Sequence, residues 1–258
     1  MPFQSILYDK QDHIVWITMN RPHSLNALNR TLWRELYKVL EKAEKDRDVN
    51  VIVITGAGRA FSAGDDIKDV ASLKSQSEIR DFFFNYAVPT VMKLIESTKP
   101  IIAAVNGPAY GGGCEIVMLC DMSIASENAV FAVPEARVGA LPPIASAIGA
   151  YLIGKLNTTM LALTGDPISA QEAKSMGMVN KVVPAEELKK TVKEVANKLM
   201  LSAPTSIKAI KKIMNEQIQL KQLERAVEEL IALFEVGEAR EGHDAFIKKR
   251  LPEWVSTR

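Results

Sequence analysis

Glu115 stands in surroundings where an acidic side chain needs an explanation. It follows three glycines in the stretch AYGGGCEIV (109–117) and precedes an apolar run. A buried carboxylate is rare unless it is paired, hydrogen-bonded or neutralised, and glycine is costly in a regular element. The start of the helix predicted here offers unpaired N–H groups that favour negative charge. We therefore expect apolar neighbours to raise the pKa of Glu115 and the helix start to lower it.

The triple glycine matches neither of two common phosphate-binding patterns. The sequence has no G-x-x-x-x-G-K-[ST] loop, and GGGCE is not the G-x-G-x-x-G fingerprint. The remaining chemical use is an oxyanion hole, in which amide donors await charge that develops in the transition state. The structural alternative is a turn that needs glycine only for tight packing.

Glu135 is a second acid that could share a site with Glu115. It lies in FAVPEARVGALPP (131–143), just after a predicted strand and behind a proline that restrains the turn. Two carboxyl groups in separate turns of one sheet can divide the roles of acid and base. The alternatives are that Glu135 pairs with Arg137 or caps a helix.

A third small-residue turn, FSAGDDIKD (61–69), also leads into a predicted helix. Its N–H groups could supply the second donor of an oxyanion hole. The structural alternative for Asp65 and Asp66 is helix capping, and we expect Asp66 to cap at least in part.

The elements that would position these turns alternate between strand and helix. SILYD and HIVWITMN predict a hairpin, and residues 29–46 predict a helix with Asn29 as its N-cap. Further strands are predicted at NVIVITG, PIIAAVNG, MSIAS and VFAV, with one or two helices before residue 97 and an apolar helix ending near 120. This βα alternation is typical of a mainly parallel sheet covered on both faces.

The last third of the chain is predicted to be helical, after a short helix and an extended exit in QEAKSMGMVNKVVP. Helices are expected at 185–200, 205–216 and 222–236. The last of them carries an apolar stripe formed by Leu223, Ala226, Val227, Leu230, Ile231 and Phe234. Such faces predict docking on the core or on another subunit.

Composition excludes several classes of protein. The 258 residues carry a formal net charge of +1, with 47% hydrophobic and 24% charged residues, so no footprint for nucleic acid or an anionic membrane is expected. No secretory signal or bilayer-spanning run is predicted. Cys114 and Cys120 are expected to be reduced thiols, which favours the cytoplasm. His13, His23 and His243 are scattered, so no metal site is expected.

Six ordered motifs resemble the enoyl-CoA hydratase/isomerase (crotonase) family over about residues 12–250. They are NRPHSLNAL, FSAGDDIKD, NGPAYGGGCEIVMLCD, VFAVPEARVGALP, TGDPISAQEAKSMGMVNKVVP and AFIKKR. The resemblance implies an α/β fold: a crotonase-like spiral of ββα units over 1–200 that holds an acyl-CoA site, and a C-terminal helical trimerisation region over 201–258. It also implies a homotrimer or homohexamer and no cofactor, because coenzyme A is part of the substrate.

The resemblance also implies roles for individual residues. The family's oxyanion hole falls on the backbone N–H groups of Asp65 and Gly112, which leaves the side chain of Asp65 incidental. The positions that match CoA-contacting segments of relatives are Leu25, Ala27, Ala63, Asp65, Asp66, Ile67, Lys68, Phe246 and Lys249. The last two touch CoA in relatives, sometimes from a neighbouring subunit.

The two glutamates indicate the subclass, since family hydratases carry both and isomerases often keep only the second. The resemblance therefore implies that Glu115 activates a water toward C3 of a trans-2-enoyl-CoA while Glu135 supplies the C2 proton. The alternatives are an enoyl-CoA isomerase that uses Glu135, a hydratase of cyclic dienoyl-CoA esters, and a non-catalytic binding protein on the same scaffold, RNA binding included.

The sequence departs from the family pattern at LPPIASAIGAYLIG (141–154). Relatives have a glycine where Pro143 stands, and the amide of that glycine helps to hold the catalytic water. Proline has no N–H to offer. We therefore expect either that the glutamates alone hold the water or that the substrate has a different shape.

Overall fold

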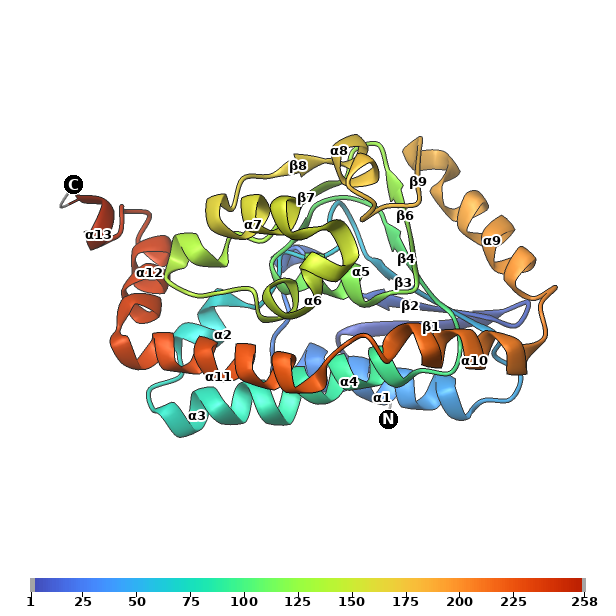
Figure 1. Cartoon of the computed structure of the whole chain (residues 1–258), viewed down its shortest axis with the longest axis horizontal. Helices are drawn as coiled ribbons and strands as arrows, with labels where there is room; N and C mark the ends of the chain where they lie inside the picture. Colours follow the sequence, from blue (N-terminus) through green and yellow to red (C-terminus); the bar gives the residue numbers. More distant parts are fainter. Residues whose placement is uncertain (1–2, 257–258) are drawn as a thin grey trace.

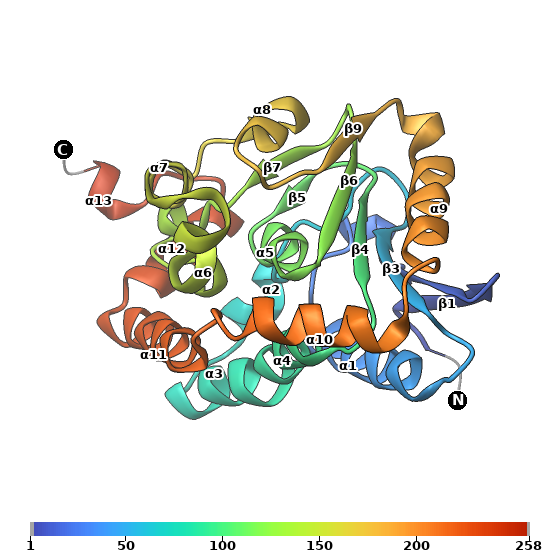
Figure 2. The same cartoon turned by 45° about the vertical axis from the view of Figure 1, so that its right-hand side comes forward.

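The computed structural model describes residues 3–256, in which two sheets are surrounded by helices (Figures 1 and 2). The larger sheet has the order β1-β2-β3-β4-β6-β9 and the smaller one the order β5-β7-β8. The strands of this region are β1 (Ile6–Gln11), β2 (Ile14–Met19), β3 (Val51–Gly56), β4 (Ile101–Val105), β5 (Ala109–Tyr110), β6 (Met122–Ser126), β7 (Val130–Ala132), β8 (Ile168–Ser169) and β9 (Lys181–Val183).

The helices of the same region include the predicted ones, with short 3-10 turns between some of them, and four that were not predicted, two in residues 143–164 and two after residue 237. In the first half they are η1 (Pro22–Ser24), α1 (Arg30–Lys45), α2 (Ile67–Ala71), α3 (Gln76–Phe82), the π-helical turn η2 (Phe83–Ala87), α4 (Val88–Glu96) and α5 (Gly112–Leu119). In the second half they are η3 (Glu135–Val138), α6 (Pro143–Ile153), α7 (Lys155–Thr164), α8 (Ala170–Ser175), η4 (Ala185–Glu187), α9 (Leu188–Leu199), α10 (Pro204–Asn215), α11 (Leu220–Val236), α12 (Glu238–Ile247) and α13 (Glu253–Ser256).

The larger sheet is parallel except for β1, which pairs antiparallel with β2 as the predicted hairpin. Its strands bury alternate residues in two cores because successive side chains point to opposite faces. In β3, Ile52 and Ile54 join the main core, whereas Val51 and Val53 join a second core under α9. The predicted parallel sheet with both faces covered is confirmed.

Local signals fixed several elements as predicted. The Asn29 side chain accepts a hydrogen bond from the Leu32 amide at 2.9 Å, so it caps α1. All six residues of the predicted stripe on α11 are buried. In Figures 1 and 2 α11 lies beside α3 and α12, and contacts also join it to α6, so this helix docks on the core of its own chain.

No helix within residues 3–256 combines the length and apolar character that a bilayer crossing needs. Cys114 is buried and Cys120 partly buried, and both are free thiols. Burial raises the pKa of both thiols above its usual range.

Candidate active site

Three turns meet at one edge because the segments that lead into them run parallel. β5 pairs parallel with β7, and a parallel bridge joins Ser62 to Ala109 of β5. The carboxyl ends of parallel segments leave a sheet at the same edge. The SAGDD turn, the triple glycine and the turn before Glu135 therefore emerge side by side, and the predicted convergence of these three motifs is confirmed.

Gly111 lies next to both Glu115 and Glu135. Its carbonyl accepts the amide of Glu115 at 2.9 Å, and a Cβ at Gly111 would lie 2.8 Å from Oε1 of Glu135. Its φ of 51° and ψ of −129° are also a conformation that side chains rarely adopt. This position therefore requires glycine twice, for its backbone angles and for the space that Glu135 occupies.

Glu115 lies in the first turn of α5 and is almost fully buried, with 3% of its surface exposed. Its Oε1 accepts hydrogen bonds from the amides of Ile144 at 2.8 Å and Ala145 at 2.9 Å. These amides belong to the first turn of α6, so the carboxyl group satisfies donors that have no partner inside the helix. Oε2 receives no hydrogen bond within residues 3–256 and stays available to a ligand.

The α6 contact is the part of the site that the sequence analysis missed. Pro143 lacks an N–H, as expected, but it occupies the first position of α6, where proline is favoured. The amides that follow it are therefore aimed at Glu115. A proline pair before an apolar run was the available signal, since it marks a helix start with free donors.

Glu135 has a different environment. It begins η3, and its Oε2 is buried without a hydrogen-bond partner among the described residues. The predicted alternative of an ion pair with Arg137 is wrong, because Arg137 binds Asp166 and the carbonyl of Thr164 instead. An unpaired buried oxygen favours the protonated carboxyl group.

Burial is the main cause of raised pKa values in both acids. Desolvation raises the pKa of Glu115 to about 8, against the lowering effect of the two α6 amides. Desolvation, and next the nearby charge of Glu115, raise the pKa of Glu135 well above its usual range. One acid thus has donors that stabilise its ionised form, and the other has almost none.

Two backbone amides beside these acids lack acceptors. The amides of Asp65 and Gly112 donate no hydrogen bond within residues 3–256. They lie close together, because a Cβ on Gly112 would be 3.8 Å from the nitrogen of Asp65. The isolated β-bridge between Leu28 and Asp65 does not use the Asp65 amide. In it, the Leu28 amide donates to the carbonyl of Gly64, and the Asp66 amide donates to the carbonyl of Leu28. Unpaired amides of this kind can bind an oxyanion.

A small cavity of about 30 Å³ adjoins these groups. It has room for one or two waters. Its polar lining comes from Asp65, Gly112, Glu115 and Trp33, and its apolar lining is formed by Phe83, Ala87, Val88, Val91, Pro143, Ile144, Leu223 and Val227. Phe83 and Ala87 belong to the π-helical turn, a feature frequent at functional sites.

The remaining predicted residues lie on the elements around the site. Leu25 and Ala63 are joined by a backbone hydrogen bond of 2.9 Å, so the SLNAL and SAGDD loops form one wall. Asp66 caps α2 through the Lys68 amide, which confirms its predicted capping role, and it also pairs with Arg21 at 3.0 Å.

Ala27 is buried in the SLNAL wall, Ile67 is half-buried, and Lys68 is exposed on α2. Phe246 is 60% exposed near the end of α12, and Lys249, which has a φ of 54°, is exposed just beyond it. α12 packs against both α2 and η3. The structure therefore brings the C-terminal residues toward the same side as the SAGDD segment of their own chain.

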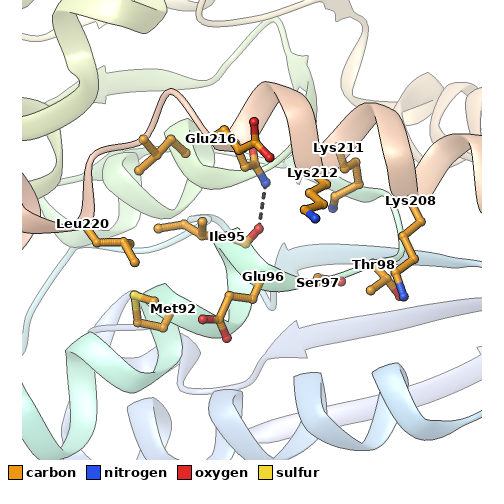
Figure 3. A pocket seen from close by; sticks show the side chains of 12 residues that line it. Met92, Ile95, Glu96, Ser97, Thr98, Lys208, Lys211, Lys212, Glu216 and Leu220 are labelled. Atoms are coloured by element: carbon orange, nitrogen blue, oxygen red, sulfur yellow. Dashed lines mark hydrogen bonds between the residues drawn. The ribbon is translucent and has the colours of Figure 1, made fainter.

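A larger cavity of about 380 Å³ lies elsewhere, between α4 and α10 (Figure 3). Its lining includes Lys208, Lys211 and Lys212 on α10 and Glu96 and Thr98 below them (Figure 3). Lys211 is buried but already bound to Asp121 and to the carbonyl of Lys99. None of the three converging turns reaches this groove, so the small cavity is the better candidate for chemistry.

Comparisons with known proteins give one consistent result. A family model described as "Enoyl-CoA hydratase/isomerase" matches residues 9–257. The chain is 37% identical to a probable mitochondrial enoyl-CoA hydratase of Dictyostelium discoideum, over 95% of this chain and 89% of that protein. It is 36% identical to a short-chain-enoyl-CoA hydratase of Clostridium acetobutylicum, over 100% of both.

A solved structure agrees with this result. The crystal structure of an enoyl-CoA hydratase from Mycobacterium avium subsp. paratuberculosis superposes with a TM-score of 0.83, at 30% identity, over 98% of this chain and 99% of that one. The fold described above is that of these hydratases.

Proposed function

The chain belongs to the enoyl-CoA hydratase/isomerase family, and from its site we propose that it adds water reversibly across the C2–C3 double bond of a 2-enoyl-CoA thioester. The observation that carries this proposal is the different hydrogen bonding of the two acids at the site. Glu115 is held by the amides of Ile144 and Ala145, whereas Glu135 has a buried, unpaired oxygen. Hydratases named among its relatives support the same reading.

In the proposed reaction the thioester oxygen binds the free amides of Asp65 and Gly112. The ionised form of Glu115, in which Oε1 accepts from two amides, removes a proton from a water through Oε2 as the water attacks C3. Negative charge moves onto the thioester oxygen, where the two amides stabilise it. Glu135 then gives its proton to C2, so one proton leaves the water, another reaches C2, and the 3-hydroxyacyl-CoA is complete.

The missing N–H of Pro143 is consistent with Glu115 as the base and Glu135 as the acid. The α6 amides hold the base, so the water would be held by Glu115 and Glu135, the first of the two outcomes expected from the sequence. Coenzyme A enters only as part of the substrate, along the wall formed by Leu25, Ala27, Ala63, Asp66, Ile67 and Lys68, with Phe246 and Lys249 beyond it.

An assay with two substrates tests this proposal. The purified protein should remove the enoyl absorbance of but-2-enoyl-CoA and form a 3-hydroxyacyl-CoA. If a 3-enoyl-CoA is consumed and no hydroxyacyl product forms from either substrate, the protein is an isomerase that uses Glu135, and the hydratase proposal is wrong.

The proposal includes a homotrimer, with a homohexamer as its paired form, and the cytoplasm as its location. Two separate apolar patches support a ring, because a ring contact joins different surfaces of neighbouring copies. One patch, on α10, exposes Ile210, Ile213 and Met214, and the other, on α7, exposes Leu156, Met160 and Leu163. The two helices lie apart in both Figure 1 and Figure 2.

Light scattering after size exclusion should give three or six times the 28.4 kDa of one chain. Ile213→Glu or Leu163→Glu should lower that mass, because a charge would be buried in the contact. Lys181→Glu, on the exposed side of β9, is the control and should leave the mass unchanged. A wild-type mass of one chain at micromolar concentration would contradict the proposed ring.

Stability should fall as pH rises, because Glu115 has a pKa of about 8 in the folded protein and an ordinary one near 4.5 when unfolded. The folded state holds its proton more tightly, so the stabilisation is complete below about pH 4.5 and is lost as pH rises through 8. Glu115→Gln removes this loss and should be more stable than wild type at pH 9, by on the order of a few kcal/mol.

Urea unfolding at pH 5, 7 and 9 measures this difference. Glu186→Gln, at an exposed site in η4, should follow the wild-type profile. A stability difference between Glu115→Gln and wild type that is the same at every pH would show that burial does not raise this pKa.

A further inference from the structure

The carboxyl group of Asp65 has an environment of its own, although the sequence analysis expected only its amide to matter. Asp65 lines the same small cavity as Glu115 and Gly112. Its carboxyl group is therefore a third acid at the site, next to the place proposed for the reacting part of the substrate.

Trp33 fixes one oxygen of this group. The indole Nε1 donates to Oδ1 of Asp65 at 2.8 Å. Oδ2 lies 3.7 Å from the Cβ position of Gly112 and receives no hydrogen bond within residues 3–256. The rotamer is thus set by the protein, and one oxygen remains unpaired.

Oδ2 accepts no hydrogen bond from the lining of the cavity among residues 3–256. Apart from the groups already described, the cavity wall is formed by carbon side chains of η2, α4 and α11, among them Phe83, Val91 and Leu223. Asp65 is partly exposed, so its Oδ2, which has no partner among residues 3–256, is open to a ligand. Desolvation raises the pKa of Asp65 to about 6, so at neutral pH the group is mostly an ionised acceptor. A ligand hydroxyl that donates to Oδ2 would give this ionised oxygen the partner that the protein does not supply.

The position of the Asp65 carboxyl group and the size of the cavity limit which ligands can bind Oδ2. Because the carboxyl group and the amide belong to one residue, a group bound to Oδ2 must lie within a few carbons of the thioester carbonyl. The cavity of about 30 Å³ leaves room for few additional atoms. An acyl group that carries a carboxylate would meet the ionised carboxyl group of Asp65, and like charges repel.

We propose that the Asp65 carboxyl group determines substrate specificity, favouring a short 2-enoyl-CoA with a hydroxyl on the carbon beyond the double bond over its unsubstituted analogue. This inference rests on the proposed hydratase function. A site that hydrogen-bonds a substrate hydroxyl discriminates against the analogue without it, because its own polar group is then left unpaired.

The test compares 4-hydroxybut-2-enoyl-CoA with but-2-enoyl-CoA. Wild type should hydrate the hydroxylated substrate with a kcat/KM at least ~10-fold higher, the scale expected for a hydrogen bond to a charged group. Asp65→Ala keeps the backbone amide and should abolish this preference. Asp69→Ala is the matched control, because it removes an acid that pairs with Arg30 at 3.2 Å and does not line the cavity; its preference should match wild type.

The outcomes distinguish failure of the Asp65 specificity role from failure of the proposed hydratase function. Equal ratios in wild type and Asp65→Ala, with but-2-enoyl-CoA still hydrated, overturn the specificity role alone. If wild type hydrates neither substrate, both proposals fail. Hydration of but-2-enoyl-CoA by Asp65→Ala shows that the variant folds. If it does not fold, Asp65→Asn, whose oxygen can still accept from Trp33, should reduce the preference, because a hydrogen bond to a charged oxygen is replaced by one to a neutral amide.

Discussion

Glu115→Gln is expected to lower the kcat of hydration by about 10²–10⁴-fold, and Glu135→Gln by a similar factor. A glutamine keeps an oxygen for the Ile144 and Ala145 amides, so the first variant loses proton transfer and not the contact with α6. In the second variant an amide replaces the proposed acid in the same space. Stopped-flow or steady-state loss of enoyl absorbance measures both.

The double variant should be little slower than either single one, because the two acids serve one step and their effects are not additive. Glu186→Gln is again the control, with unchanged turnover. Unchanged turnover in both site variants would falsify the hydratase assignment. An isomerase would lose activity with Glu135→Gln and keep it with Glu115→Gln.

Gly112→Ala should separate activity from folding. Among the glycines of residues 3–256 without positive φ, it is the only one whose Cβ position has no atom within 3.0 Å, the nearest being Cδ1 of Leu28 at 3.2 Å. The added methyl would lie 3.8 Å from the amide nitrogen of Asp65, against the space proposed for the thioester oxygen. We expect a melting temperature near that of wild type and a kcat lower by ~10²–10³-fold, the scale for one lost oxyanion donor.

Gly113→Ala provides the contrast, because its Cβ would lie 2.7 Å from the carbonyl oxygen of Ser62. That variant should unfold at a lower temperature. Circular dichroism melting beside the hydration assay distinguishes the two results. Full turnover in a folded Gly112→Ala variant would remove Gly112 from the oxyanion hole.

Local signals in the sequence were sufficient for most of the fold. The Asn29 cap and the stripe of α11 are short-range patterns, and the structure contains both. β5 and β8 were missed because two-residue strands have no periodicity to detect. α6 and α7 were not predicted because their residues 143–164 show no clear polar face.

The site was predictable where its residues stand in turns with unusual composition. Glu115, Glu135 and the three converging turns were found in this way. Trp33, Phe83 and Leu223 were not, because they lie far apart in the sequence and look like ordinary apolar residues of helices. Only the tertiary structure brings a tryptophan of α1 to the carboxyl group of Asp65.

The start of α6 has a further consequence for the energetics of the reaction. A glutamate side chain that is free to rotate would lose conformational entropy each time it reached the reactive orientation. Here two peptide dipoles hold Oε1 before any ligand arrives, so that ordering is completed once, when the chain folds. The proposed base is thus preorganised by a helix that does not itself contribute a side chain to the proton transfer.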